Sequence, residues 1–266
     1  MTLTLTILGC GSSGGVPRVG NDWGACDPQN PRNRRRRCSL LATRQSPQGA
    51  TRVLIDTSPD LREQMLAAQV PHLDAVWYTH DHADHTHGID DLRPFFLVQR
   101  KRLPLHANAN TMRTLQSRFA YCFVSANDYP AIAEPNEILP FEEITSHGAG
   151  GSITAQPIPV LHGNLDALCF RFGDAAYMPD VNGLPGTAKA ALQGLDLLII
   201  DALRYKRHPS HFALEETLDV IADLKPKRSV ITNMHVDVDY DTLSRALPQG
   251  TIPAHDGLEL HVKTPA

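Results

Sequence analysis

The stretch "YTHDHADHTHGIDD" spans residues Tyr78 to Asp91 and packs four histidines and two aspartates between Tyr78 and Gly88. It begins where the apolar run "DAVWYT", residues 74–79, ends, and that run predicts a buried strand. Imidazole and carboxylate are common ligands of divalent transition metals. A lone histidine at a strand end is more often a surface residue, but four ligand-type side chains at His-x-His-x-Asp-His spacing are rare. The stretch is therefore interpreted as part of a metal site.

The spacing within this stretch predicts two adjacent metal positions. Alternate residues after a strand turn to one side, so His80 and His82 can converge on one point. Asp84 and His85, slightly further along, can converge on a second point nearby. A loop of this length can begin both positions but cannot complete either, so further ligands must come from elsewhere in the chain.

Three later residues, each following a predicted strand, are the candidates to complete the site: His162, Asp180 and His235. A carboxylate has two oxygens and can bridge two cations, which makes Asp180 the expected shared ligand. The prediction is a two-metal centre with three further ligands on each cation: His80, His82 and His162 for the first; Asp84, His85 and His235 for the second. This mixed donor set suits Zn, Mn and Fe, of which Mn or Zn is expected.

Short apolar runs alternate with helical patterns along the chain, which favours an α/β layered fold. Neither a repeat nor a linker interrupts the pattern, so residues 1–266 are expected to form a single domain. The expected strands are residues 3–8, 52–56, 74–79, 152–160, 168–172, 175–180, 195–201 and 228–232. The expected helices are residues 59–69, 88–102 with a local break at Pro94, and 211–224.

Composition excludes several classes of partner. Apolar residues make up 42% and charged residues 20% of the chain, and the net charge is −4. This balance carries no general basic footprint for nucleic acid or anionic lipid. Five irregularly spaced cysteines indicate a reducing compartment. No apolar run approaches the roughly 18 residues of a membrane span, and the start "MTLTLTILGC" lacks a basic leader, so a cytoplasmic protein is expected.

The order of the motifs resembles that of the metallo-β-lactamase superfamily: His-x-His-x-Asp-His, a later histidine, a bridging aspartate and a final histidine. All seven predicted ligands match this order, and the resemblance covers almost the whole chain. It implies a four-layer αββα sandwich with a dinuclear metal site at the edge of the two sheets.

Three local stretches are similar to the phosphodiesterase branch, above all to phosphoribosyl 1,2-cyclic phosphodiesterases: "LGCGSSGGVPR" (Leu8–Arg18), "CSLL" (Cys38–Leu41) and "HPSHFALEETL" (His208–Leu218). In that branch a histidine before the last ligand reaches the substrate phosphate. His211 matches the position at the expected start of a helix and is favoured for this role, with His208 as the alternative.

One departure separates the chain from those phosphodiesterases, which hold an additional structural zinc. Asn21, Trp23 and Cys26 stand at the positions of its three cysteines, and Val238 stands at the position of its histidine. Since three of the four ligands are missing, the zinc site is expected to be absent and the chain to represent a related subfamily. Cys26 and Cys38 alone cannot form a closed four-coordinate site.

An arginine-rich run in the same early loop, "RNRRRR", contains Arg32 and Arg34 to Arg37. These side chains can grip the phosphates of a nucleotide, because arginine forks match phosphate oxygens. They can equally form a solvated basic loop or pair with acidic neighbours where the zinc is lost. Both interpretations are kept.

The resemblance implies a dinuclear-metal phosphodiesterase that acts on a small, cyclic or nucleotide-like phosphodiester. A hydroxide held between the cations would attack phosphorus in line, with Asp84 orienting it. His211, as imidazolium, would stabilise the transition state and protonate the leaving group.

Three alternatives share the motifs. One is a relative of the pyrroloquinoline quinone biosynthesis protein with iron and oxygen chemistry, and another is a tRNA 3′-end endonuclease, although no basic tRNA-gripping arm is evident. The third is a metal- or nucleotide-binding module without turnover, which would have no use for His211. Homodimers are common in the family.

Overall fold

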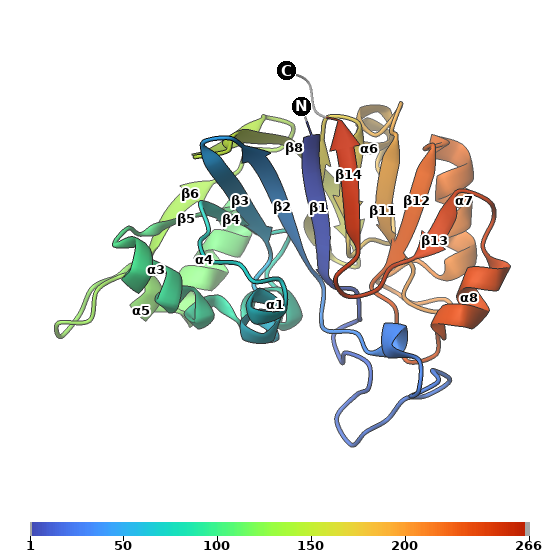
Figure 1. Ribbon diagram of the computed structural model, residues 1–266. Helices are drawn as coiled ribbons and strands as arrows, with labels where there is room; N and C mark the ends of the chain where they lie inside the picture. Colours follow the sequence, from blue (N-terminus) through green and yellow to red (C-terminus); the bar gives the residue numbers. More distant parts are fainter. Residues whose placement is uncertain (1, 264–266) are drawn as a thin grey trace.

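The computed structural model describes residues 2–263, which form two seven-stranded sheets packed face to face (Figure 1). The first sheet has the strand order β14-β1-β2-β3-β4-β5-β6 and the second β13-β12-β11-β10-β9-β8-β7. The strands of the first sheet are β1 (Thr2–Gly9), β2 (Ser39–Ser46), β3 (Gly49–Ile55), β4 (Ala75–Trp77), β5 (Leu103–Ala107), β6 (Ala133–Glu137) and β14 (Glu259–Lys263). Those of the second are β7 (Ile144–Gly148), β8 (Gly151–His162), β9 (Leu165–Phe172), β10 (Ala175–Met178), β11 (Leu197–Asp201), β12 (Arg228–Thr232) and β13 (Thr251–Pro253).

Each sheet has an antiparallel part and a parallel part. β14, β1, β2 and β3 pair antiparallel, whereas β3 to β6 pair parallel. In the second sheet, β7 to β10 pair antiparallel and β10 to β13 pair parallel. Loops that follow parallel strands leave the sheet at the same edge, where functional side chains of α/β proteins gather.

Helices cover both outer faces, which confirms the predicted αββα sandwich (Figure 1). The helices on the side of the first sheet are α1 (Leu61–Ala67), α2 (Ala83–Thr86), η2 (Ile89–Leu92), α3 (Arg93–Gln99), α4 (Ala109–Arg118) and α5 (Ala120–Phe123). Those on the second are α6 (Gly186–Ala191), α7 (Leu214–Leu224) and α8 (Tyr240–Ala246), and η1 (Pro31–Asn33) lies in the loop after β1. None of the helices within residues 2–263 is long and apolar enough to cross a membrane.

Trp77, the last residue of β4, joins the two sheets at the centre of the core. Its fully buried ring stacks on Phe172 of β9 at 5.9 Å between centroids and contacts Phe170 at 5.6 Å. The indole nitrogen donates a 3.1 Å hydrogen bond to Ser146 Oγ of β7, so the polar edge of the ring is satisfied. This packing fixes the end of β4, from which the His80–His85 loop departs.

All eight expected strands are present, with boundaries that differ by a few residues. β4 is shorter than its apolar run and β8 is longer, reaching His162. The expected helix over residues 88–102 is divided into η2 and α3, which meet just before Pro94; the proline stands in the first turn of α3, where its missing N–H has no intrahelical partner to lose. His211 lies two residues before Ala213, the N-cap of α7, and therefore in a loop rather than at the helix start.

The arginine-rich run serves mainly to fasten the loop between β1 and β2. Arg36 pairs with Asp256 at 2.9 Å and Arg37 with Asp60 at 2.8 Å. Arg32 stacks over Tyr240 and Arg34 over Trp23, at 5.0 and 5.2 Å from the ring centroids. These contacts favour the interpretation in which the arginines pair with neighbours over the one in which they grip a nucleotide.

Arg35 is buried beside Cys26 in the early loop. Its Nη2 donates to Asn33 Oδ1 at 3.0 Å, and its Nη1 lies 3.9 Å from the Cys26 sulfur. The Cys26 thiol itself faces the carbonyls of Val236 and Val238 at 3.3 Å. The Arg35 guanidinium thus holds the early loop together, and the Cys26 thiol connects that loop to the segment after β12.

Asp239 is the carboxylate that completes this connection. It accepts hydrogen bonds from Asn33 Nδ2 at 2.7 Å, from the Asp27 amide, and from the Thr242 amide in the first turn of α8. Burial alone would raise the pKa of Asp239, but these donors lower it to about 2.

Replacing Trp77 with alanine should destabilise the protein by about 3–5 kcal/mol, because a large fully buried ring and its inter-sheet contacts are lost. Urea unfolding followed by circular dichroism would measure this. Val98→Ala, on an exposed position of α3, should change stability by less than about 0.5 kcal/mol. Equal effects of the two substitutions would contradict the central role of Trp77.

The stabilising effect of Asp239 should depend on acid pH. Since the folded-state pKa is about 2 and the unfolded value is about 3.9, the contribution is complete above pH 4 and is lost as the pH falls toward 2. Asp239→Asn should therefore be less stable than the wild type at pH 6, with a smaller difference at pH 2. Thermal unfolding at both pH values tests this, and a constant difference would refute it.

Candidate metal centre

The predicted ligands come together where loops leave the two sheets. His80 lies three residues beyond β4, and His82 is the N-cap of α2, whose single turn contains Asp84 and His85. This loop is tied to the residues after β3, because Thr57 N donates to His85 O at 2.8 Å and Gly88 N donates to Thr57 O at 2.9 Å. A side chain at position 88 would collide with the Ser58 carbonyl, which accounts for the glycine there.

His162 and Asp180 meet this loop from the second sheet. His162 is the last residue of β8, and Asp180 follows β10 by two residues. One possible metal-binding group consists of four residues whose ligand atoms all lie within 4.8 Å of one another: His80, His82, His162 and Asp180. A second group, by the same measure, contains Asp84, His85 and again Asp180. The shared carboxylate is the one predicted to bridge.

The tautomers in the first group direct free lone pairs to its centre. Thr79 Oγ1 donates to Asp56 Oδ2 at 2.8 Å, so it can only accept from His80 Nδ1 at 2.9 Å. His162 Nδ1 faces the Ser210 carbonyl at 2.6 Å and must donate to it. The Nε2 atoms of both rings therefore carry lone pairs, which is the state a metal requires.

His82 is the remaining histidine of the first group. Its Nδ1 lies 3.2 Å from His162 Nε2, which already carries a lone pair. Burial lowers the pKa of His162, and burial together with neighbouring imidazoles holds the pKa of His80 well below its usual value. At neutral pH these rings are uncharged acceptors, and a shared cation satisfies them together.

The second group is rich in negative charge. His85 Nε2 lies 3.2 Å from Asp180 Oδ1 and 3.5 Å from Asp84 Oδ2, and His85 Nδ1 lies 2.8 Å from Asp56 Oδ2. Burial alone would lower the pKa of His85, but the carboxylates of Asp180, Asp84 and Asp56 raise it well above its usual value. A divalent cation bound here would balance these carboxylates and leave His85 neutral.

Buried polar atoms without partners show that the donor set fits metal ions. His80 Nε2, His85 Nε2 and Asp180 Oδ1 are buried within the cluster and make no hydrogen bond. Leaving such atoms unsatisfied is costly, so each one calls for a ligand. All three belong to the two groups, and their imidazole and carboxylate chemistry suits a transition metal.

His235 is the predicted ligand that the structure does not bring into either group. It lies three residues beyond β12 and lines the same cavity, but its Nε2 contacts Arg18 Nη1 at 3.2 Å. Its Nδ1 lies 3.2 Å from Asp237 Oδ2. The second group therefore has three protein ligands where the sequence predicts four.

His211 stands beside Asp180, the carboxylate that the two groups share. Its Nε2 is 3.9 Å from Asp180 Oδ2, and its Nδ1 bonds to the buried Asp201 Oδ2 at 2.7 Å. Burial alone would lower the pKa of His211, but the Asp201 carboxylate raises it to about 9. His211 is thus a cationic donor near pH 7. His208, the alternative, lies further out and hydrogen-bonds with Ser210.

A cavity of about 290 Å³ opens onto the cluster. His80 and His85 lie buried beneath it. Six of the predicted site residues line it: His82, Asp84, His162, Asp180, His211 and His235. Ser12 and Ser13 of the glycine-rich turn contribute from one strand end and Arg204 from another. The volume suits a small substrate.

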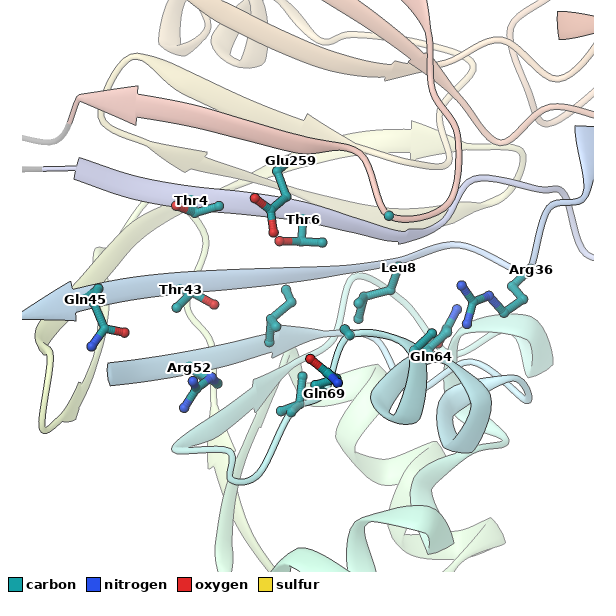
Figure 2. A pocket seen from close by; sticks show the side chains of 15 residues that line it. Thr4, Thr6, Leu8, Arg36, Thr43, Gln45, Arg52, Gln64, Gln69 and Glu259 are labelled. Carbon is teal, nitrogen blue, oxygen red and sulfur yellow. The ribbon is translucent and has the colours of Figure 1, made fainter. Parts of the chain in front are cut away.

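A larger groove, of about 490 Å³, lies on the outer face of the first sheet (Figure 2). Thr4, Thr6, Thr43 and Gln45 point into it from the strands, and Gln69 lies at its helical side. It shares no lining residue with the cavity over the cluster. The groove lacks the histidines and convergent carboxylates of the metal centre, so the chemistry belongs to the smaller cavity.

Two buried aspartates that the sequence analysis did not single out position the site. Asp56 accepts from the Thr79 amide and hydroxyl and from His85, and its φ of 64° is in the left-handed region. Asp201 holds His211 and accepts from Val181 N. Both stand at the ends of predicted strands, the same signal that identified Asp180, so this signal could have found them.

Comparison with known proteins defines the class. A family profile described as the beta-lactamase superfamily domain matches residues 51–234. Together with the αββα sandwich and the His/Asp cluster, this match shows that the chain belongs to the metallo-β-lactamase superfamily.

Within the superfamily, the chain resembles a diphosphatase from the PhnP family, with a TM-score of 0.88, 38% identity and 98% of each chain covered. It is also 33% identical to an octanoyltransferase of Porphyromonas gingivalis over 95% of this chain and 50% of that protein. Coenzyme PQQ synthesis protein B of Methylobacterium nodulans is 29% identical over 165 residues, 58% of this chain and 51% of that protein. The chain spans about half the length of these two curated relatives.

Asp56→Asn should weaken metal binding about 10- to 100-fold, because the amide cannot hold His85 and Thr79 as the carboxylate does. Titration of the metal-free protein with Mn²⁺ or Zn²⁺ measures the change. Asp166→Asn, at an exposed position of β9, removes the same charge and should leave the affinity unchanged. A folded Asp56→Asn protein with wild-type affinity would show that Asp56 does not position the ligands.

Proposed function

We propose that the protein is a metal-dependent phosphoesterase that hydrolyses a small phosphodiester or diphosphate. The observation that carries this proposal is the His211–Asp201 pair, placed 3.9 Å from the carboxylate that joins the two metal-binding groups. A protein that only binds metal has no need of a cationic histidine held by a buried aspartate at the mouth of the site. A phosphoryl-transfer enzyme does, because charge develops on the phosphoryl and leaving oxygens.

The donor set supports two divalent cations, Mn or Zn by preference, with Fe as a further possibility. Cations held there supply Lewis-acid charge to the phosphoryl oxygens and lower the pKa of water. We assign the first cation to His80, His82 and His162, and the second to Asp84, His85 and His235, with Asp180 shared. His235 joins the second group only if it releases Arg18.

The residues around the cavity supply the remaining chemistry. His211 Nε2 donates a hydrogen bond to a phosphoryl oxygen and gives its proton to the leaving oxygen as the P–O bond breaks. The Asp84 carboxylate accepts a hydrogen bond from the attacking water, orients it toward phosphorus and takes up the proton that the water loses as the new P–O bond forms. Asp201 holds the His211 imidazole in position while the proton leaves. Its carboxylate then favours reprotonation of this imidazole from solvent.

The comparisons support this choice among the alternatives. The structure that is 38% identical is described as a diphosphatase, which fits phosphoryl transfer to water with either an alkoxide or a phosphate as leaving group. In sequence, the coenzyme PQQ synthesis protein is 29% identical over 58% of this chain, compared with 38% identity over 98% for the diphosphatase. Requirement for both Fe(II) and O₂ would favour that branch.

The proposal is tested by elemental analysis together with turnover. About two metals per chain are expected, with hydrolysis of bis(p-nitrophenyl) phosphate or ADP that a chelator abolishes and Mn²⁺ or Zn²⁺ restores. Two metals without turnover of either substrate would refute the phosphoesterase proposal. Cleavage of ADP alone would make it a diphosphatase.

His211→Ala should lower kcat about 10²- to 10⁴-fold because the general acid is lost, while the metal content remains at the wild-type level. Elemental analysis and steady-state kinetics of the same preparation measure both. His208→Ala is the matched control and should retain most of the activity. Loss of metal in His211→Ala would instead make this histidine part of the metal site.

A further inference from the structure

Arg18 is held in a fixed orientation at the edge of the cavity. It lies in the glycine-rich loop after β1, where its amide donates to Asp22 O at 2.9 Å and its carbonyl accepts from Asp22 N at 3.3 Å. Its Nε donates to Asp22 Oδ2 at 2.9 Å, and Nη2 contacts the same oxygen. Backbone and side chain thus hold the guanidinium together, which leaves Nη1 pointing away from Asp22.

Nη1 points at the predicted metal ligand His235. Arginine only donates, so His235 Nε2, 3.2 Å away, must be the acceptor and must carry the ring's lone pair. The proton then lies on Nδ1, next to Asp237 Oδ2 at 3.2 Å. This tautomer is the one that a metal-binding histidine requires, but its lone pair is already in use.

The lone pair of His235 Nε2 can serve one partner only. A cation bound to it and a hydrogen bond from Arg18 exclude each other, both by geometry and because two positive charges would share one acceptor. The second metal-binding group accordingly has three protein ligands and the first has four. Binding of a cation to His235 must release Arg18 Nη1.

Once released, Nη1 needs another acceptor near the cavity. Asp22 still holds the other side of the guanidinium, and Ser12 and Ser13 of the same loop line the cavity. We propose that Arg18 exchanges His235 for a phosphoryl oxygen of the substrate when the second cation binds. The phosphoryl part of this inference rests on the proposed function; the exchange at His235 does not.

The exchange places donors on both sides of the centre. His211 stands by Asp180 Oδ2, the oxygen nearest the His80 and His162 nitrogens. Arg18 stands by His235, the ligand that the sequence predicts for the second cation. A phosphoryl group over the two cations would then be held by an imidazolium at one side and a guanidinium at the other. Arginine suits this place because its planar fork can bond Asp22 and the substrate at the same time.

The first experiment tests the release of His235 by Arg18 through the affinity for Mn²⁺ alone. Metal-free wild type, Arg18→Ala and Arg34→Ala are titrated with Mn²⁺ by calorimetry. Arg34 belongs to the same loop and is exposed over Trp23, so its loss removes the same charge away from His235. Arg18→Ala should bind the second Mn²⁺ about three- to tenfold more tightly, with the first unchanged. An unchanged or weaker second site in Arg18→Ala would overturn the exchange.

The second experiment tests the substrate contact with inorganic phosphate on the Mn²⁺-loaded proteins. Arg18→Ala should weaken phosphate binding about tenfold or more, since a charge-assisted hydrogen bond is lost. Arg18→Lys should recover part of it and Arg34→Ala should match the wild type. Equal losses in Arg18→Ala and Arg34→Ala would mean a general charge effect and would overturn the contact.

The two experiments separate the possible failures. If the wild type binds no phosphate and hydrolyses no phosphoester, the proposed function and the phosphoryl contact both fall, while the Mn²⁺ titration still decides the exchange. If turnover is present but phosphate affinity in Arg18→Ala stays within twofold of the wild type, the proposed function stands and the role of Arg18 in binding is refuted.

Discussion

The Asp56 carboxylate is the interaction on which the site depends most. It is fully buried at the end of β3 and accepts three hydrogen bonds, from the Thr79 amide, the Thr79 hydroxyl and the His85 ring. Because the Thr79 hydroxyl donates its hydrogen bond to Asp56, it can only accept the hydrogen bond from His80 Nδ1. One carboxylate therefore sets the tautomers of two histidines that belong to different metal-binding groups. Trp77, two residues before Thr79, anchors the same loop to the core from the other side.

This arrangement concentrates negative charge in the protein interior. Asp56, Asp84 and Asp180 all lie around His85, and the protein does not provide a lysine or arginine that neutralises them among the contacts of the described residues. Buried carboxylates are tolerated when they are paired or coordinate metals. The charge thus explains both the raised pKa of His85 in the protein alone and the affinity for cations that the proposed function requires. Metal binding and stability of the loop are coupled for the same reason.

A feature of the fold or the site could be predicted from the sequence when a short stretch of neighbouring residues indicates it. The ligand-rich loop, the strands before His162 and Asp180, and the layered sandwich were predictable, because each shows in a short window of apolar residues followed by polar ones. Asp56 and Asp201 carry the same signal, but they hold His85 and His211 in place and match no position of the ligand motif. The contact between Arg18 and His235 joins residues far apart in sequence through an irregular loop, and no local pattern encodes it. Burial of Arg35 beside Cys26 is of the same kind, because nothing local in the arginine-rich run distinguishes this buried side chain from its neighbours.

The two halves of the centre are consequently unequal in a way that the motif does not reveal. In the first group, Thr79 and the Ser210 carbonyl fix the tautomers of His80 and His162, and the His162 Nε2 lone pair contacts another ligand of the same group, His82 Nδ1. In the second group, three carboxylates raise the pKa of His85, and the His235 Nε2 lone pair accepts a hydrogen bond from Arg18. A cation entering the first group replaces a contact between two of that group's own ligands, whereas one that binds His235 must displace the Arg18 guanidinium. The affinity for the second cation therefore depends on whether an anion is bound in the cavity. An anion that accepts a hydrogen bond from Arg18 frees His235 and makes binding of the second cation more favourable. On the proposed function, substrate and second cation would then favour each other's binding, since each supplies what the other's arrival leaves unsatisfied.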